Sequence, residues 1–255
     1  MLWALEFPPI EHLFKWPALL LKGTPFEVNK TVLLTFLSLA IVLGIFLVAA
    51  RRTALVPTGV RNVVEMGIEF IDRGIAREII GPEGAAWSPF LTAMFFFILF
   101  MNLFEIIPLL QFPPTARMSL PGYLAIQTWI LFLAVGIKAQ GPLGYLKSSL
   151  FPPGVPKALY VLVVPIEFLS TFLVRPFSLA VRLFANMMAG HLLLVAFYVI
   201  CAAVWSKTPL VAILPLPLAT LVGVTGFELL VAVLQAYIFT ILTAVYIGSS
   251  IHAEH

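Results

Sequence analysis

The chain has 255 residues, of which 61% are hydrophobic and only 11% are charged, with a formal net charge of +3. Soluble domains carry about 25% charged residues, so this composition excludes an ordinary soluble domain and indicates a polytopic membrane protein of roughly five to seven spans. The scattered basic residues give no sign of nucleic-acid binding, and the single cysteine, Cys201, excludes an intramolecular disulfide and a cysteine zinc cluster.

The N-terminal residues 1–30 are predicted to form a segment on the outer side of the membrane. They begin MLWALEFPPIEHLF, which has no basic n-region and breaks at Pro8-Pro9, so we expect no signal peptide. The first span is predicted at 31–50, between Lys30 and Arg51. At about 1.5 Å per residue, this length matches a bilayer core of about 30 Å.

Residues 60–80 are predicted to form an amphipathic helix on the membrane surface. Charged and apolar side chains interleave along VRNVVEMGIEFIDRGIAREII, a pattern that is typical of interfacial helices. A soluble connecting helix is the alternative interpretation.

A helical hairpin is predicted over 88–137. Its first span, 88–110, ends in the polar residues Asn102 and Glu105, which are followed by Pro108. Its second span, 122–137, is short for a bilayer, so it either begins earlier or thins the membrane.

Residues 158–250 are predicted to form a long antiparallel hairpin of two steeply tilted helices. The apolar runs 158–205 and 218–250 are both too long for perpendicular spans, and a turn-like patch around Pro209 separates them. The expected fold is therefore an all-α integral membrane protein. It has a single membrane domain, 1–255, with about five membrane helices and one surface helix.

Lysine and arginine positions predict the orientation of these spans. Eight of them fall in the loops 51–87 and 138–157, and five fall in the segments on the other side of the membrane. Because cytoplasmic loops are enriched in basic residues, we expect the N-terminus outside and the C-terminus in the cytoplasm.

Ionisable side chains within spans are rare and usually functional. Structural explanations exist for some of them. Arg175 could extend to the headgroups, carboxylates near span ends could lie at the interface, and buried amides could join helices. The polar residues in question are Asn102, Glu105, Glu167, Arg175, Arg182, Asn186, His191, Glu228 and Gln235.

Arg182 is the hardest of these to explain structurally. It lies seven residues beyond Arg175, about 10 Å deeper along a helix, where inserting a charge costs roughly 2.5–3.5 kcal/mol. Ser178, Arg182 and Asn186 share one helix face at i, i+4 and i+8. The small residues Ala185 and Ala189 lie beside that face and allow a partner helix to approach. A guanidinium that does not deprotonate could there attract a passing carboxylate.

Folding the two long helices back about Pro209 places several polar residues at matching levels. Arg182 then falls opposite Gln235, and His191 falls opposite Glu228. Asn186 falls opposite Ala232. A straight hairpin cannot satisfy the first two pairs at once, so tilt or a local bulge is expected, with Gly190 as a plausible site.

Three sequences resemble subunit a of the F-type ATP synthase, in its actinobacterial version. They are MNLFEIIP at 101–108, RPFSLAVRLFANMMAGH at 175–191 and ELLVAVLQAYIFTILTAVYI at 228–247. The resemblance covers about residues 25–250.

The resemblance implies a role for each polar residue. Arg182 corresponds to the essential stator arginine facing the c-ring, with Gln235 as its neighbour on the last helix. Ser178 and Asn186 share its polar face. Glu167 resembles an acid near the inner proton half-channel. The outer half-channel is expected to be lined by Asn102, Glu105, His191 and Glu228.

The implied function is that of a proton-conducting stator subunit of Fo, which forms two half-channels against the c-ring and couples proton flow to rotation and ATP synthesis. The expected partners are the c-ring, the b subunits and the rest of F1Fo, in a bacterial plasma membrane. No catalytic site, cofactor or metal is expected. A stand-alone transporter or proton channel is the alternative, which the absence of sequence repeats disfavours. An intramembrane hydrolase is disfavoured because neither HExxH nor GxSxG occurs.

Overall fold

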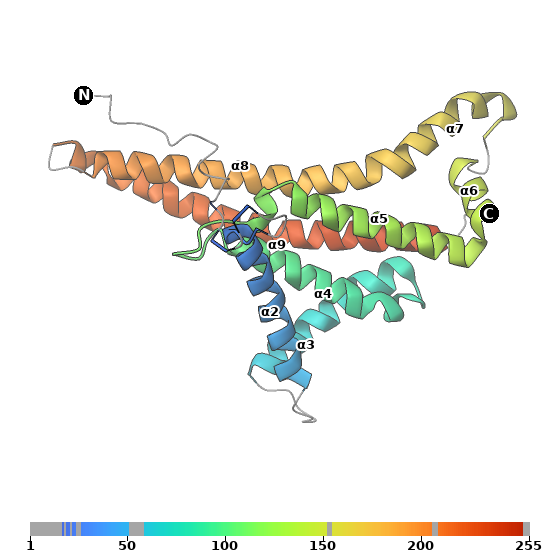
Figure 1. The fold of residues 1–255 in the computed structure, drawn as a ribbon, viewed down its shortest axis with the longest axis horizontal. Coiled ribbons are helices and arrows are strands. Elements are labelled where there is room, and N and C mark those ends of the chain that lie inside the picture. Colours follow the sequence, from blue (N-terminus) through green and yellow to red (C-terminus); the bar gives the residue numbers. More distant parts are fainter. Residues whose placement is uncertain are drawn as a thin grey trace. The chain divides into compact units, whose positions relative to one another are not determined.

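Helices dominate the chain in the computed structural model, as Figure 1 shows. The structure describes residues 17, 19–20, 22–23, 27–50, 59–151, 155–205 and 209–251. Within these ranges the β-type pairing consists of one isolated bridge, between Leu20 and Val28. Five helical stretches of the same ranges are long and apolar enough to cross a membrane: Lys30–Leu47, Gly84–Leu103, Ser119–Gln140, Tyr160–Val204 and Val211–Ile251. The predicted all-α membrane fold is confirmed. Most of the expected outer segment 1–30 lies outside the described residues.

The first span and the expected surface helix form close to their predicted positions. Helix α2 spans Lys30–Ala50, and the Asn29 side chain caps it by accepting the Val32 N–H at 3.1 Å. Helix α3 spans Val60–Ile71 and continues as a π-helical stretch over Asp72–Ile80. The range 60–80 is therefore helical throughout, with a change of winding at Asp72.

The central hairpin differs from the prediction at its ends. Helix α4 spans Gly84–Leu103, so it begins before residue 88 and ends before Glu105. Turns follow it, and Leu109 and Gln111 adopt positive φ angles of 77° and 42° there. After a short 3₁₀ turn at Pro114–Ala116, helix α5 spans Ser119–Gln140. At 22 residues, α5 is long enough to cross a bilayer without thinning it.

The C-terminal half contains the two longest helices. Helix α6, Pro142–Leu150, precedes α7, Tyr160–Leu169, which passes through a π-helical turn at Ser170–Val174 into α8, Arg175–Val204. A 3₁₀ turn at Pro209–Ile213 then leads into α9, Pro215–Ile251. The expected bulge at Gly190 is wrong, because α8 is regular there and the irregular winding lies at 170–174.

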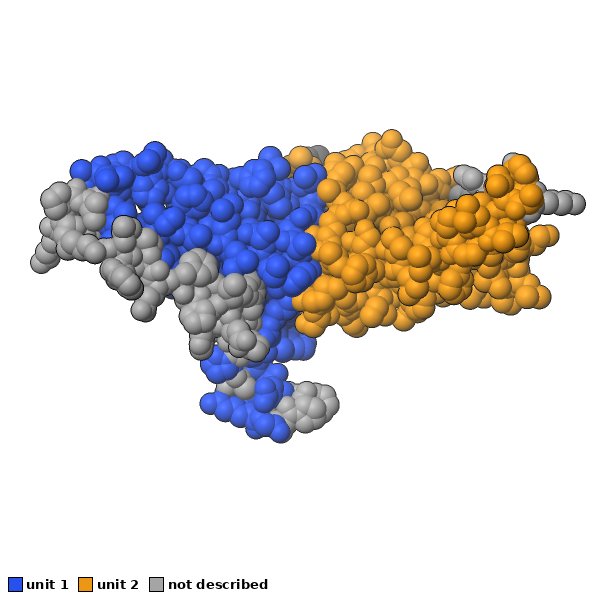
Figure 2. Space-filling view, turned by 90° about the horizontal axis from the view of Figure 1, so that it is seen from above, with its two compact units in different colours: residues 1–41, 97–117, 183–236 blue, residues 42–96, 118–182, 237–255 orange. Residues whose placement is uncertain are grey.

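The chain divides into two compact units, coloured separately in Figure 2. Unit 1 comprises residues 1–41, 97–117 and 183–236, and unit 2 comprises 42–96, 118–182 and 237–255. Helices α2, α4, α8 and α9 contribute residues to both units.

Unit 2 is held together around the C-terminal part of α9. Gly248 lies against the backbone of the π-helical stretch, since a Cβ there would meet the Ile79 carbonyl oxygen at 3.2 Å. Tyr246 packs against Phe132 and lies under the Arg175 guanidinium, 5.4 Å from its ring centroid. The Gln140 side chain donates a hydrogen bond to the Ser250 carbonyl at 2.9 Å. Aromatic and amide contacts therefore fix α9 against α5 and α8 within this unit.

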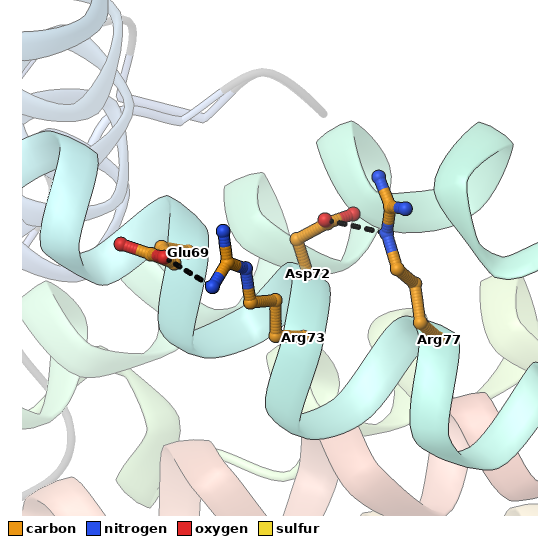
Figure 3. A network of polar contacts seen from close by, with 4 residues as sticks. All are labelled: Glu69, Asp72, Arg73 and Arg77. Atoms are coloured by element: carbon orange, nitrogen blue, oxygen red, sulfur yellow. Dashed lines mark hydrogen bonds and ion pairs between the residues drawn. The ribbon is translucent and has the colours of Figure 1, made fainter.

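The charged side chains of α3 and its π-helical extension pair locally. Figure 3 shows Arg73 joined to Glu69 and Arg77 joined to Asp72. The distances between nitrogen and oxygen in these two pairs are 3.0 Å and 2.8 Å. Apolar Val63, 66% exposed, lies on the same element. The segment is amphipathic as predicted, and its place on the membrane surface stays a prediction.

Candidate functional site

Three ionisable side chains meet in the interior of unit 1. Glu105 comes from the turn after α4, His191 from α8 and Glu228 from α9, and they are only 4%, 6% and 4% exposed. His191 Nδ1 lies 3.8 Å from a carboxylate oxygen of Glu105. That separation is longer than a hydrogen bond and suits a bridging water.

Glu228 reaches this cluster because residue 190 is a glycine. A Cβ at Gly190 would collide with the carboxyl group of Glu228, so the carboxyl lies directly against the backbone of α8. The neighbouring residue on that helix is His191. The glycine thus provides a close approach between α8 and α9 rather than the expected bulge.

The carboxyl groups of Glu105 and Glu228 each have one oxygen without a hydrogen-bond partner among the described residues. Glu105 Oε1 and Glu228 Oε2 are buried and accept no hydrogen bond from the part of the chain that the structure describes. Buried polar atoms are nearly always paired, and exceptions often mark sites of ion or proton exchange. The cluster has the chemistry of a proton relay, because carboxylates and imidazole both take up and release protons.

A cavity of about 200 Å³ opens beside Glu105 and His191. It has room for several water molecules, each of which occupies about 30 Å³ in the liquid. Three further polar side chains line it, namely Gln111, Tyr198 and Thr225, together with the apolar residues Ile106, Leu194, Val195 and Leu221. Glu228 is not among the residues that line the cavity.

The sequence reasoning missed these three polar lining residues, although two of them carry a signal. Tyr198 follows His191 by seven positions, and Thr225 precedes Glu228 by three, so each shares a helix face with a cluster residue. Gln111 lies in the irregular turn after α4, where no helical period exists to reveal it.

Asn102 is fully buried at the end of α4, with 0% exposure. Its amide nitrogen donates to the Ala232 carbonyl of α9 at 3.4 Å, and its amide oxygen accepts the Thr115 hydroxyl at 2.7 Å. Asn102 is therefore placed near the cluster as expected, but it is not among the residues that line the cavity. Thr115 was not singled out from the sequence.

The expected polar face of α8 is continuous, since Ser178, Arg182 and Asn186 follow one another at helical spacing in a regular helix. Ser178 and Arg182 are partly buried residues of unit 2, and Asn186 is an exposed residue of unit 1. Asn186 donates to the Gln235 side-chain oxygen at 2.7 Å. The simple fold-back placed Asn186 opposite Ala232, and the side-chain bond reaches Gln235, three residues further along α9.

Glu167 occupies a different setting from the cluster residues. It lies near the end of α7 in unit 2, where it is partly buried. The described residues contain no group of three or more His, Cys, Asp or Glu side chains that could hold a metal ion.

Comparisons with known proteins identify relatives over most of the chain. The family model described as ATP synthase A chain matches residues 32–248. The ATP synthase subunit a of Frankia alni is 45% identical over 229 residues, which cover 89% of this chain and 79% of the relative. The subunit a of Rhodococcus erythropolis is 43% identical and covers 97% and 90% of the two chains. That of Granulibacter bethesdensis is 41% identical and covers 85% of each.

Proposed function

Because the chain belongs to the ATP synthase A chain family, and so is the non-catalytic, proton-translocating stator subunit of Fo, we propose that Glu105, His191 and Glu228 form its outer proton path. The observation that supports this assignment is their convergence. Two buried carboxyls from different segments approach one histidine beside a cavity. Such groups are costly to bury and are retained where protons or ions move.

The order of the groups gives the path a direction. Protons enter the cavity past Gln111 and Tyr198 and reach Glu105 and His191, which line it. Water admitted to the cavity connects the two groups in this path. Neutral imidazole takes a proton on one ring nitrogen and releases one from the other, so His191 passes the proton on to Glu228.

The face of α8 that carries Arg182 meets the c-ring in this proposal. Arg182 cannot deprotonate, so its fixed charge favours the ionised form of a c-ring carboxylate and blocks a direct proton leak. Ser178 and Asn186 keep this face polar, and the hydrogen bond from Asn186 to Gln235 of α9 holds part of it in place. Glu167 serves the inner path, through which protons leave on the cytoplasmic side.

The remaining assignments concern the setting of the subunit. It is a multi-pass membrane protein, and we place it in a bacterial plasma membrane with the N-terminus outside and the C-terminus in the cytoplasm. The b subunits join the c-ring as its neighbours. Each proton that crosses 100 mV supplies about 2.3 kcal/mol for rotation. The alternative of a stand-alone transporter or channel is not favoured.

The test is to replace each buried carboxyl by its amide isostere in the assembled complex. In inverted membrane vesicles, Glu105→Gln and Glu228→Gln should each lower ATP-driven proton pumping about a hundredfold or more, because positioned acid–base groups contribute about 10²–10⁴-fold. The matched control is Glu83→Gln, an exposed carboxyl between the π-helical stretch and α4.

Complex yield, measured by co-purification of the c-ring and F1, separates loss of assembly from loss of pumping. Pumping at the wild-type rate by an assembled Glu105→Gln or Glu228→Gln complex contradicts the assignment of that residue to the path.

A further inference from the structure

Two buried hydrogen bonds in series, which we call the strut, connect three segments of unit 1 near the outer proton path. Three segments take part in it: the 3₁₀ turn Pro114–Ala116, the end of α4 and the middle of α9. The Thr115 hydroxyl donates to the Asn102 oxygen at 2.7 Å, and the Asn102 nitrogen donates to the Ala232 carbonyl at 3.4 Å. Thr115 and Asn102 are both 0% exposed.

The strut ends close to both carboxyl groups along the chain. Ala232 follows Glu228 by four residues, one turn of α9, so the two lie on the same helix face. Asn102 precedes Glu105 by three residues, and its carbonyl accepts the Glu105 N–H at 3.2 Å. Holding Asn102 against Ala232 therefore fixes the turn that carries Glu105 relative to the level of Glu228.

The Ala232 carbonyl can only accept, so it requires the nitrogen end of the Asn102 amide, and Thr115 holds that orientation by donating to the oxygen end. An asparagine side chain has one accepting end and one donating end, and a hydroxyl that donates to the oxygen leaves the nitrogen to face the α9 carbonyl. The turn that carries Thr115 is itself anchored, because Arg117 donates to the Thr31 hydroxyl of α2 at 3.2 Å. A fixed turn is thus connected, through the Thr115 hydroxyl and the Asn102 amide, to the segments that carry Glu105 and Glu228.

We propose that Thr115 is a positioning residue of the outer proton path, which acts through Asn102 to set Glu105 against the Glu228 level of α9. The inference rests on the proposed function of Glu105 and Glu228. It gives Asn102 a holding role, because both ends of its amide are engaged within the protein. Thr115 itself touches no proton in this scheme.

The experiment compares Thr115→Val, which keeps the shape and removes the hydroxyl, with Thr115→Ser, which keeps the hydroxyl. The F1Fo complex with each variant is assayed for ATP-driven proton pumping in membrane vesicles between about pH 5 and 9, a window that brackets histidine titration. The groups that bear on this profile are Glu105 on the turn, Glu228 on α9 and His191 on α8, with Lys30 of α2 acting on His191 through its charge.

We expect Thr115→Val to assemble and to pump about tenfold more slowly, below the roughly hundredfold loss that a 1 Å misplacement of reacting groups can cause. Its pH profile should shift, because the surroundings of Glu105 change. Thr115→Ser should pump with the wild-type profile. The matched control is Thr128→Val, which removes an equally buried hydroxyl of α5 that makes no hydrogen bond within the described residues, and it should leave pumping unchanged.

An assembled Thr115→Val complex with wild-type rate and pH profile overturns the inference. If Thr115→Val does not assemble, Thr115→Ala replaces it in the comparison with Thr115→Ser, and equal pumping by the two also overturns it. Failure of both Val and Ala variants to assemble, while Thr128→Val assembles, reduces Thr115 to a folding residue and overturns it too. A wild-type pumping rate in Glu105→Gln would instead overturn the proposed path, so the two failures are distinguishable.

Discussion

The buried polar side chains of the two units differ in kind. Among the described residues, unit 1 buries the hydroxyls of Thr31, Ser38 and Thr115 and, in addition, carboxyls, an imidazole and amides, at Asn102, Glu105, His191, Glu228 and Gln235. The buried polar side chains of unit 2 are all hydroxyls: Ser88, Thr92, Thr128, Thr171, Thr240, Thr243 and Ser250.

The two units illustrate two ways of burying a polar side chain in an apolar helix. A hydroxyl can bond within its own helix, as when Thr243 donates to the Phe239 carbonyl at 2.9 Å and Ser250 to the Tyr246 carbonyl at 2.8 Å, and it then needs no second helix. A carboxyl or imidazole has no such local partner and is expensive to bury. The concentration of such groups in unit 1 therefore points to function, whereas the Glu69–Arg73 pair of unit 2 lies at exposed positions.

The largest effect is expected at Arg182, the partly buried cation of the α8 polar face. Arg182→Ala should abolish ATP-driven proton pumping and ATP synthesis in membrane vesicles while the complex stays assembled. Arg182→Lys should also fail, because lysine lacks the planar fork and can deprotonate when buried.

The control is Arg73→Ala, whose side chain is 77% exposed. Normal rates of ATP synthesis with either Arg182 variant would remove this residue from the mechanism. They would leave the cluster of unit 1 and Glu167 as the remaining charged candidates.

An intermediate effect is expected at Gly190. Gly190→Ala introduces a Cβ that collides with the Glu228 carboxyl, so the carboxyl must move away from α8. Alanine is about 1 kcal/mol more favourable than glycine inside a helix, so the change does not weaken α8 itself. We expect pumping to fall about tenfold in an assembled complex, within the loss that small misplacements cause.

Two variants sharpen this prediction. Adding Glu228→Asp to Gly190→Ala shortens the acid and should restore part of the pumping. Gly44→Ala in α2 adds a Cβ with no heavy atom within 4 Å and should change nothing. If Gly190→Ala pumps normally, the close approach of Glu228 to α8 is not required for proton pumping.

The smallest effect is expected at the exposed ion pair of α3. Glu69→Gln removes the partner of Arg73, and both side chains are more than half exposed. Exposed i,i+4 pairs contribute about 0.3–0.5 kcal/mol, so the thermal stability of the complex should shift only slightly and pumping should be unchanged. A pumping loss comparable to that of Gly190→Ala would break the distinction between the two units.

The parts of the fold and of the site that could be predicted from the sequence are those with a regular helical repeat. The five membrane helices follow from apolar length, and the polar face of α8 follows from i, i+4 spacing, so both were accessible. The fold-back about Pro209 brought His191 and Glu228 to nearby levels, as the contact of Glu228 with Gly190 shows. It did not identify Gln235 as the partner of Asn186, because a backbone register ignores the reach of side chains along the helix.

The parts that were missed lie where the chain has no regular repeat. Thr115 and Gln111 occupy turns between α4 and α5, and their positions depend on long-range contacts that the local sequence does not encode. Tyr198 and Thr225 could have been found by extending the helix faces of His191 and Glu228. Gly190 was noticed, but its role depends on a neighbour 38 positions away.

The π-helical turn at Ser170–Val174 sets the angular phase between α7 and α8. A π-turn accommodates one residue more than the α-helical winding around it, and one residue corresponds to about 100° of rotation in an α-helix. Glu167 lies before this turn and Arg175 after it, so the direction in which Glu167 projects is not the one that counting α-helical residues back from Arg175 gives. The extra residue therefore adds a fixed rotation between the two parts of one continuous helix. Removing it would turn the acid to another side without altering any residue that carries a charge.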